Sequence, residues 1–291
     1  MKSNYRYIVK AFMAMAVIAG TTSCDDFLDR EPMSSISPET YYSTAAQLEA
    51  NLNDEYPNVL PSFGQWTYGI FGEDKGTDNQ IEVNANDRYT QDRWKVPHSE
   101  SDNWKFERIY RINFFLSEAL PKFGEDMSGS QNTISGSVAT IKHYIGEMYF
   151  LRAYEYFKKL QLFGDFPIIN QPLADEMEAL REASKRFPRN EVARFIISDL
   201  DKAYAYMSDV DMATTRINKD AAMLVKSRVA LFEATWLQNF KGTAFVPGGE
   251  GWPGASLHNN DQYPSGNLDN EVKYFLEQAV EASKLVADKY K

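Results

Sequence analysis

The chain has little cysteine and little histidine, and each shortage disfavours a class of protein. Its 291 residues include one cysteine, so no disulfide can form within the chain. The three histidines, His98, His143 and His258, are far apart and lack the spacing of a zinc site. Neither a Gly-x-Ser-x-Gly motif nor a phosphate-binding loop is present. The sequence therefore indicates no metal and no cofactor and disfavours an enzyme, although its many carboxylates leave a glycosidase pair as an open alternative.

Basic residues are also in the minority, since the formal charge is −10. An acidic surface argues against nucleic acid and against anionic lipid as partners. Segment 1–23 holds three cations and no acidic residue, so its removal would change the charge from −10 to −13. After the N-terminal segment, no stretch is apolar enough to span a bilayer. Attachment to a membrane would therefore have to come from acyl chains.

The single cysteine, Cys24, occupies an informative position. Three cations and the apolar run Ala11–Gly20 precede it, and Asp25 and Asp26 follow it. The run is well short of the roughly 20 residues that a spanning helix needs. Cations, a short apolar run and small residues before the cut are typical of a secretory signal. We predict a lipoprotein signal peptide over 1–23 and lipidation of Cys24. Ordinary cleavage that leaves a free cysteine is the alternative.

Apolar residues spaced by three and four predict a helical protein. The expected helices cover residues 44–56, 101–120, 138–163, 190–206, 219–239 and 270–290. Pro57 and Pro121 are expected to end the first two, and Gly164 the third. The expected N-caps are Thr44 (in a capping box with Gln47), Asn190 and Asn218. No segment alternates as a strand does. We predict an all-α fold of antiparallel helix pairs, with tetratricopeptide-like units and long loop insertions.

Two long connections, 57–99 and 241–267, show no helical period and are rich in glycine, asparagine and aromatic residues. A connection of roughly 40 residues without elements of its own is uncommon in compact domains and is often functional. We therefore expect ligand contacts in these two regions.

Four stretches, in order, resemble the SusD/RagB family of outer-membrane nutrient-uptake lipoproteins. They are Cys24–Pro32, the helix positions from Trp104 to Leu116, Gly146–Pro167 and Pro188–Leu231. The most specific is Gly146–Pro167, which contains Phe-Leu-Arg-Ala-Tyr and then Phe-Gly-Asp-Phe-Pro. We interpret Arg152 and Asp165 of this stretch as structural, because Arg152 lies among aromatic residues and Asp165 can bond backbone N–H groups at a helix end.

The resemblance implies a helical domain over 24–291, anchored by lipid to the outer membrane and facing the exterior. It implies that the domain binds an oligosaccharide and delivers it to a TonB-dependent, SusC-like transporter, without covalent chemistry. Family members are usually longer, so the chain is expected to be the N-terminal part of a longer architecture, lacking a C-terminal half.

Aromatic rings bind sugars by stacking on the apolar faces of the pyranose, while polar groups fix the hydroxyls. The resemblance implies glycan contacts from the first long connection. The candidate ligand-binding residues there are Trp94, Arg88, Asp78 and Tyr89, and those in the second connection are Trp252 and Tyr263. Core packing is the alternative for Trp94 and also for Trp66, and Trp104 is expected in the core.

Two other functions remain open. An uptake lipoprotein of the same architecture could bind peptides, with backbone hydrogen bonds in place of stacked tryptophan. A purely structural helical-repeat scaffold would be indifferent to Trp94→Ala and Trp252→Ala.

Overall fold

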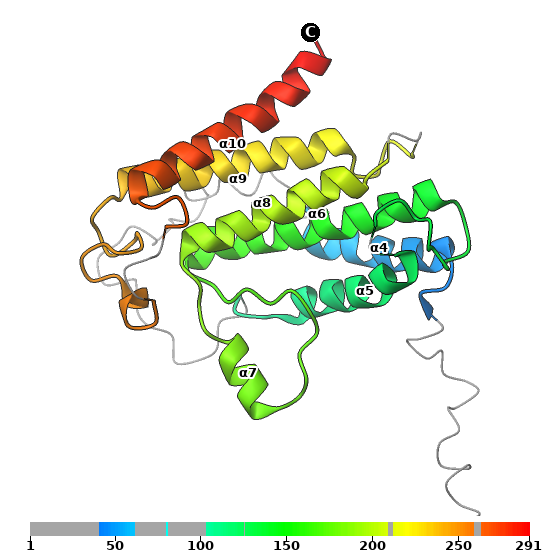
Figure 1. The fold of residues 1–291 in the computed structure, drawn as a ribbon, viewed down its shortest axis with the longest axis horizontal. Helices are drawn as coiled ribbons and strands as arrows, with labels where there is room; N and C mark the ends of the chain where they lie inside the picture. Colours follow the sequence, from blue (N-terminus) through cyan, green and yellow to red (C-terminus); the bar gives the residue numbers. More distant parts are fainter. Residues whose placement is uncertain (1–40, 62–79, 81–102, 125, 209–211, 259–262) are drawn as a thin grey trace, which may run out of the picture. The chain divides into compact units, whose positions relative to one another are not determined.

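The structure is a computed structural model that describes residues 41–61, 80, 103–124, 126–208, 212–258 and 263–291. These residues form seven α-helices and one short 3-10 helix, and they contain no strand beyond two isolated bridges. The elements are α4 (Ala45–Val59), α5 (Glu107–Phe123), α6 (Val138–Phe163), α7 (Met177–Ala183), α8 (Arg189–Tyr206), α9 (Lys219–Asn239), η3 (Pro253–Ser256) and α10 (Leu268–Lys289) (Figure 1). The all-α class predicted from the sequence is confirmed.

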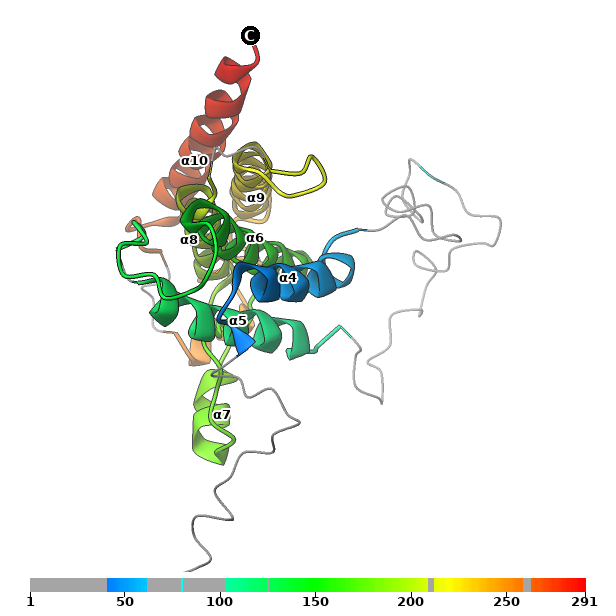
Figure 2. The same cartoon turned by 90° about the vertical axis from the view of Figure 1, so that its right-hand side faces the viewer.

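The long helices stack side by side, largely in chain order. Helix α6 contacts α4, α5 and α8, while α9 lies between α8 and α10. Successive long helices run in opposite directions (Figure 1), which produces the antiparallel pairs of a tetratricopeptide-like fold. The short helix α7 stands outside this stack in both views (Figures 1 and 2). Among the helices in the described part of the chain, none is both long and apolar enough to cross a membrane.

Helix α6 is the centre of the stack and is buried on almost every side. Its residues Ile141, Met148 and Tyr156 are each 0% exposed. At Gly146 the backbone of α8 comes so close that a Cβ atom would lie 2.8 Å from the amide nitrogen of Met207. Glycine therefore allows α6 and α8 to approach each other at this point.

Two helices begin and end where the sequence predicts. Helices α6 and α9 span Val138–Phe163 and Lys219–Asn239, as expected. The Asn218 cap on α9 is confirmed, because its side chain accepts a hydrogen bond of 2.9 Å from the amide of Ala221. The capping box of Thr44 and Gln47 is also confirmed at the start of α4.

Two expected helix ends were wrong. Pro57 and Pro121 lie inside α4 and α5, which continue to Val59 and Phe123. A proline removes one hydrogen bond from the helix. Val59 is 2% exposed and Phe123 is 0% exposed, so burial of these side chains stabilises the last turn in spite of that loss.

Other boundaries also differ from the prediction. Helix α5 begins at Glu107, so Trp104 precedes the helix and is half-buried rather than lying on its apolar face. Asn190 is the second residue of α8 and not its cap. Its side-chain NH2 group donates a hydrogen bond of 3.2 Å to the carboxylate of Glu271. Helix α10 begins at Leu268, two residues earlier than expected, and α7 was not predicted.

Candidate functional site

Because the long helices alternate in direction, three connections emerge at one end of the stack (Figure 1). They are the α4–α5 connection, the α6–α8 connection that contains α7, and the α9–α10 connection. The last turns of α6 hold both ends of the first one. Lys158 Nζ donates to the carbonyl of Val59 at 3.0 Å, and Lys159 Nζ donates to that of Asn103 at 2.7 Å. The described ends of both connections therefore lie at this end of the stack.

A cavity of about 470 Å³ lies at this end of the stack. The last residues of α6, the segment just before α8 and the α9–α10 connection line it. The side chain of Phe245, which is 62% exposed, is the most accessible aromatic group in the lining. This size lies within the ordinary range for small-molecule sites, which is roughly 300–1,000 Å³.

Asp165 ties the walls of the cavity together. One carboxylate oxygen accepts the backbone N–H of Arg189 at 2.9 Å, and the other accepts the indole N–H of Trp252 at 2.8 Å. Burial raises the pKa of Asp165, while these two bonds act in the opposite direction. Asp165 thus joins the end of α6 to the start of α8 and to the α9–α10 connection. The expected bond to a backbone N–H is confirmed.

Trp252 and Tyr263, the two candidate residues that the structure describes, both use their polar atoms to hold the α9–α10 connection. Trp252 lines the cavity but is only 4% exposed, and its ring stacks on His258 with centroids 6.0 Å apart. The Tyr263 hydroxyl donates to the carbonyl of Pro247 at 2.6 Å, and burial raises its pKa. Ligand contact by either residue stays a prediction.

Arg189 lines the cavity with a charge that is already neutralised. Its guanidinium bonds the carboxylate of Glu233 at 3.0 and 2.9 Å and lies 4.2 Å from the centre of the Trp236 ring. Burial raises the pKa of Glu233, and the charge of Arg189 acts in the opposite direction. This pair connects α8 to α9 and holds Arg189 in the cavity lining.

Arg186 is in a different situation, because its side chain is exposed at the cavity wall. Its guanidinium carbon lies 4.6 Å from the centre of the Trp104 ring. Trp104 in turn packs edge-on against Phe163 and Phe166, at 4.8 and 4.9 Å. Within the described residues no carboxylate forms an ion pair with Arg186.

The sequence did not single out Phe245 or Arg186. The weak signals are that Phe245 lies just before a Pro-Gly-Gly turn, and that Arg186 belongs to the basic segment Lys185–Arg189 that leads into a helix. The other candidates, Trp94, Arg88, Asp78 and Tyr89, lie outside the described residues, as do Trp66 and Cys24.

The most specific sequence stretch has a structural role. Arg152 binds both carboxylate oxygens of Asp199, at 2.6 and 2.8 Å, and also bonds the side-chain oxygen of Asn113 and the carbonyl of Asn170. Arg152, Asp199 and Asn113 are buried, whereas Asn170 lies at the surface. Arg152 therefore joins α5, α6, α8 and the segment that follows α6, and its ion-pair partner is Asp199.

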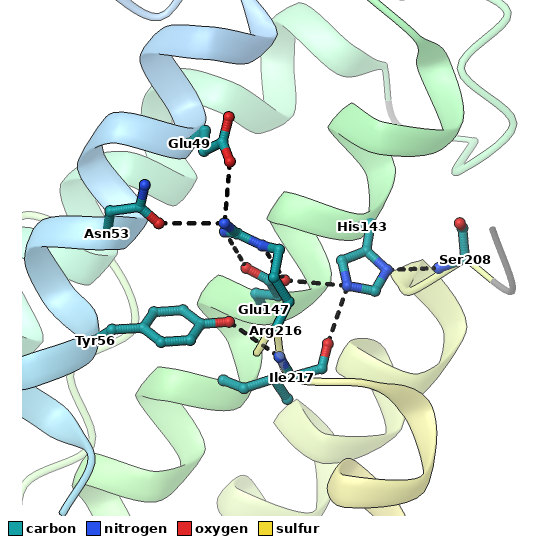
Figure 3. A network of polar contacts seen from close by, with 8 residues as sticks. All are labelled: Glu49, Asn53, Tyr56, His143, Glu147, Ser208, Arg216 and Ile217. Atoms are coloured by element: carbon teal, nitrogen blue, oxygen red, sulfur yellow. Dashed lines mark hydrogen bonds and ion pairs between the residues drawn. The ribbon is translucent and has the colours of Figure 1, made fainter. Parts of the chain in front are cut away.

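A second buried network holds the opposite end of the stack, where α4, α6 and the α8–α9 connection meet (Figure 3). Arg216 binds Glu147 at 2.8 and 2.7 Å and reaches Glu49 at 3.2 Å. His143 Nδ1 accepts the amide N–H of Ser208 at 3.2 Å, so its proton lies on Nε2, near Ile217 and Glu147. The buried polar groups here bind one another, while Glu49 lies at the edge of the network with a side chain that is 44% exposed. In the part of the chain that the structure describes, no cluster of three or more ligating side chains could hold a metal ion.

A family model, two curated relatives and a solved structure all relate this chain to SusD-like proteins. Residues 26–231 match the family model SusD-like_3, described as starch-binding associating with outer membrane. SusD-like proteins P25 and P2 of Formosa agariphila are each 25% identical, over 74% and 83% of this chain and 41% and 46% of their own lengths. A SusD-like protein of Bacteroides fragilis has the same fold, with a TM-score of 0.50 and 21% identity over 73% of this chain and 39% of its own. The chain thus spans less than half the length of these relatives.

Proposed function

The chain belongs to the SusD/RagB family, and on that premise we propose that it is an outer-membrane lipoprotein that captures extracellular oligosaccharide. The observation that carries the proposal is the cavity at the loop end of the stack, where the exposed ring of Phe245 adjoins polar and charged groups. Such a ring can stack on the apolar face of a pyranose while neighbouring polar groups bind its hydroxyls. The protein binds its ligand and does no covalent chemistry.

The first long connection is proposed to complete the site. Its described ends are fixed to α6 by Lys158 and Lys159, so the chain leaves and re-enters the stack at the cavity end. Trp94, Arg88, Asp78 and Tyr89 are proposed to contact the glycan from this connection, together with Trp252 and Tyr263 from the other.

The anchor and the partner are also proposals. Residues 1–23 are proposed to be removed as a signal peptide, and Cys24 to carry lipid, with the protein facing the exterior. A TonB-dependent transporter is proposed to receive the oligosaccharide. Joining a weak binder to a transporter raises the effective concentration of ligand at the transporter, so each separate contact can be weak.

Affinity electrophoresis tests the proposal. The full chain carrying Cys24→Ser is run in detergent through gels that contain different polysaccharides. At least one polysaccharide is expected to slow the protein, and Phe245→Ala is expected to abolish the effect. Tyr290→Ala is the control, since Tyr290 is 70% exposed at the C-terminal end of α10.

A protein that is folded by circular dichroism but is slowed by no polysaccharide contradicts the proposal. Binding of oligopeptides by that same protein would instead support the peptide-binding alternative.

A further inference from the structure

The described lining of the cavity is more basic than acidic, although the chain as a whole is acidic. The whole chain carries −10, but among the described residues the charged side chains that line the cavity are Lys185, Arg186, Arg189 and one carboxylate, Asp165. Both oxygens of Asp165 already accept hydrogen bonds, from Arg189 and Trp252. The carboxylate is thus occupied by the protein and offers a ligand little.

The three cations are not equivalent. Arg189 is 3% exposed and bound to Glu233, and Lys185 pairs with Glu182 on the surface. Arg186 is exposed and has no ion pair within the described residues, and the Trp104 ring lies behind its guanidinium at 4.6 Å. Stacking on an aromatic ring holds a guanidinium by its face and leaves its N–H edges free to bind.

An arginine arranged in this way suits an anion. Guanidinium groups bind carboxylate, sulfate and phosphate oxygens through paired, charge-assisted hydrogen bonds. Asp165 is a counter-charge in the same lining, but it forms no ion pair with Arg186, so a neutral sugar would leave Arg186 without a direct ionic partner among the described residues. The exposed ring of Phe245 lines the same cavity, so one ligand could use both groups.

We infer that the cavity binds a sugar carrying an anionic group, a uronate carboxylate or a sulfate ester, with Arg186 binding the anion and Phe245 stacking on the ring. This inference rests on the proposed function and names its substrate class. The net charge of −10 disfavours non-specific attraction of an anionic polymer, so binding of such a polymer calls for a local basic site such as this cavity.

The test uses pairs of polysaccharides that share a backbone and differ in charge. Polygalacturonate and its methyl-esterified form compare carboxylate with neutral ester, while dextran sulfate and dextran compare sulfate with hydroxyl. The full chain in detergent is titrated with each by isothermal calorimetry. A preference of about tenfold or more for one charged member is expected, as for a hydrogen bond to a charged group. A preference within the polygalacturonate pair indicates a carboxylate ligand, and a preference within the dextran pair indicates a sulfate ligand.

Two variants test whether Arg186 causes the preference for the charged polysaccharide. Arg186→Gln is expected to lower affinity for the charged member about tenfold and to leave affinity for the neutral member unchanged. Arg181→Gln is the matched control, because it removes the same charge from α7, where the side chain is 72% exposed outside the cavity lining. Both variants change exposed residues, so the fold is expected to persist.

The inference is overturned if charged and neutral members bind equally, or if Arg186→Gln binds the charged member as tightly as the unchanged chain does. Neutral binding that is lost in Phe245→Ala would then leave the proposed function standing. If no polysaccharide of either kind binds, both the inference and the proposed function fail.

Discussion

Several buried carboxylates in the described part of the chain join two helices through a paired arginine, and three of them link α8 to α6, α9 and α10. Asp199 and Glu233 are 0% exposed and bind Arg152 and Arg189, and Glu271, also 0% exposed, binds Arg194. Such pairs add little net stability compared with apolar residues of the same shape, but removal of one partner leaves a buried charge uncompensated. They therefore fix which helices lie together and in which register.

Removal of Arg152 without Asp199 is expected to destabilise the fold strongly. Arg152→Ala leaves Asp199 buried and unpaired and is expected to lower the free energy of unfolding by about 3–5 kcal/mol. Urea unfolding followed by circular dichroism measures this. The double variant Arg152→Met, Asp199→Leu is expected to recover much of the loss. A loss below about 1 kcal/mol, the range of an exposed pair, would show that the pair has no such role.

The ionised carboxylate of Glu271 is expected to stabilise the fold at neutral pH and to lose this effect in acid. Burial raises its pKa, but hydrogen bonds from Arg194, Ser265 and Asn190 outweigh burial, and the pKa lies below the ordinary value of 4.5. A carboxylate with a lowered pKa stabilises the fold above its unfolded pKa, and this stabilisation is lost as the pH falls through the folded pKa. Glu271→Gln is therefore expected to cost about 1–3 kcal/mol at pH 7.

Urea midpoints measured from pH 7 down to pH 3 test this sign. The difference between Glu271→Gln and the unchanged chain is expected to be largest at neutral pH and to shrink below about pH 4.5. A difference that stays constant, or grows, as the pH falls would contradict the role assigned to the ionised carboxylate.

At the level of whole helices, local signals alone located two elements well. Helices α6 and α9 were placed to the residue, because each has a regular apolar period and a side-chain cap at its start. Proline misled the prediction at Pro57 and Pro121, since the burial of Val59 and Phe123 is a tertiary effect that no local pattern reveals. Asn190 misled it for the same reason, because its partner Glu271 is 81 residues away.

The site was harder to predict than the helices. The two connections were recognised by composition, but Phe245 and Arg186 matter because α6, α8 and the α9–α10 connection meet around them. That meeting depends on contacts such as Asp165 with Trp252, which are 87 residues apart. Spacing along a sequence carries no information about such pairs.

The contact between α6 and α8 is expected to outweigh helix propensity at Gly146. In an open helix, alanine is more favourable than glycine by about 1 kcal/mol. Here the added Cβ would lie 2.8 Å from the amide nitrogen of Met207 and 2.9 Å from the carbonyl oxygen of Ala203. Gly146→Ala is therefore expected to destabilise the protein by about 1–3 kcal/mol, as overpacking does. Thermal unfolding measures it, and a raised melting temperature would refute the tight contact.

Over the whole molecule, the two ends of the helical stack have different roles. One end is held by the Arg216, Glu147 and His143 network (Figure 3), in which the polar groups bind one another. The other end carries the long connections and the 470 Å³ cavity, with exposed Phe245 and Arg186. We therefore propose that ligand capture takes place at the second end, while the first end supports the fold.

Hydrogen–deuterium exchange with a bound ligand tests this placement most directly. The ligand is an oligosaccharide cut from whichever polysaccharide the protein binds, added at saturation. Exchange is expected to slow in segments 184–188 and 243–258, which line the cavity, and to stay unchanged in 126–137 and 212–218 at the opposite end. Protection confined to the opposite end, or none in the two cavity segments despite saturation, would contradict the account.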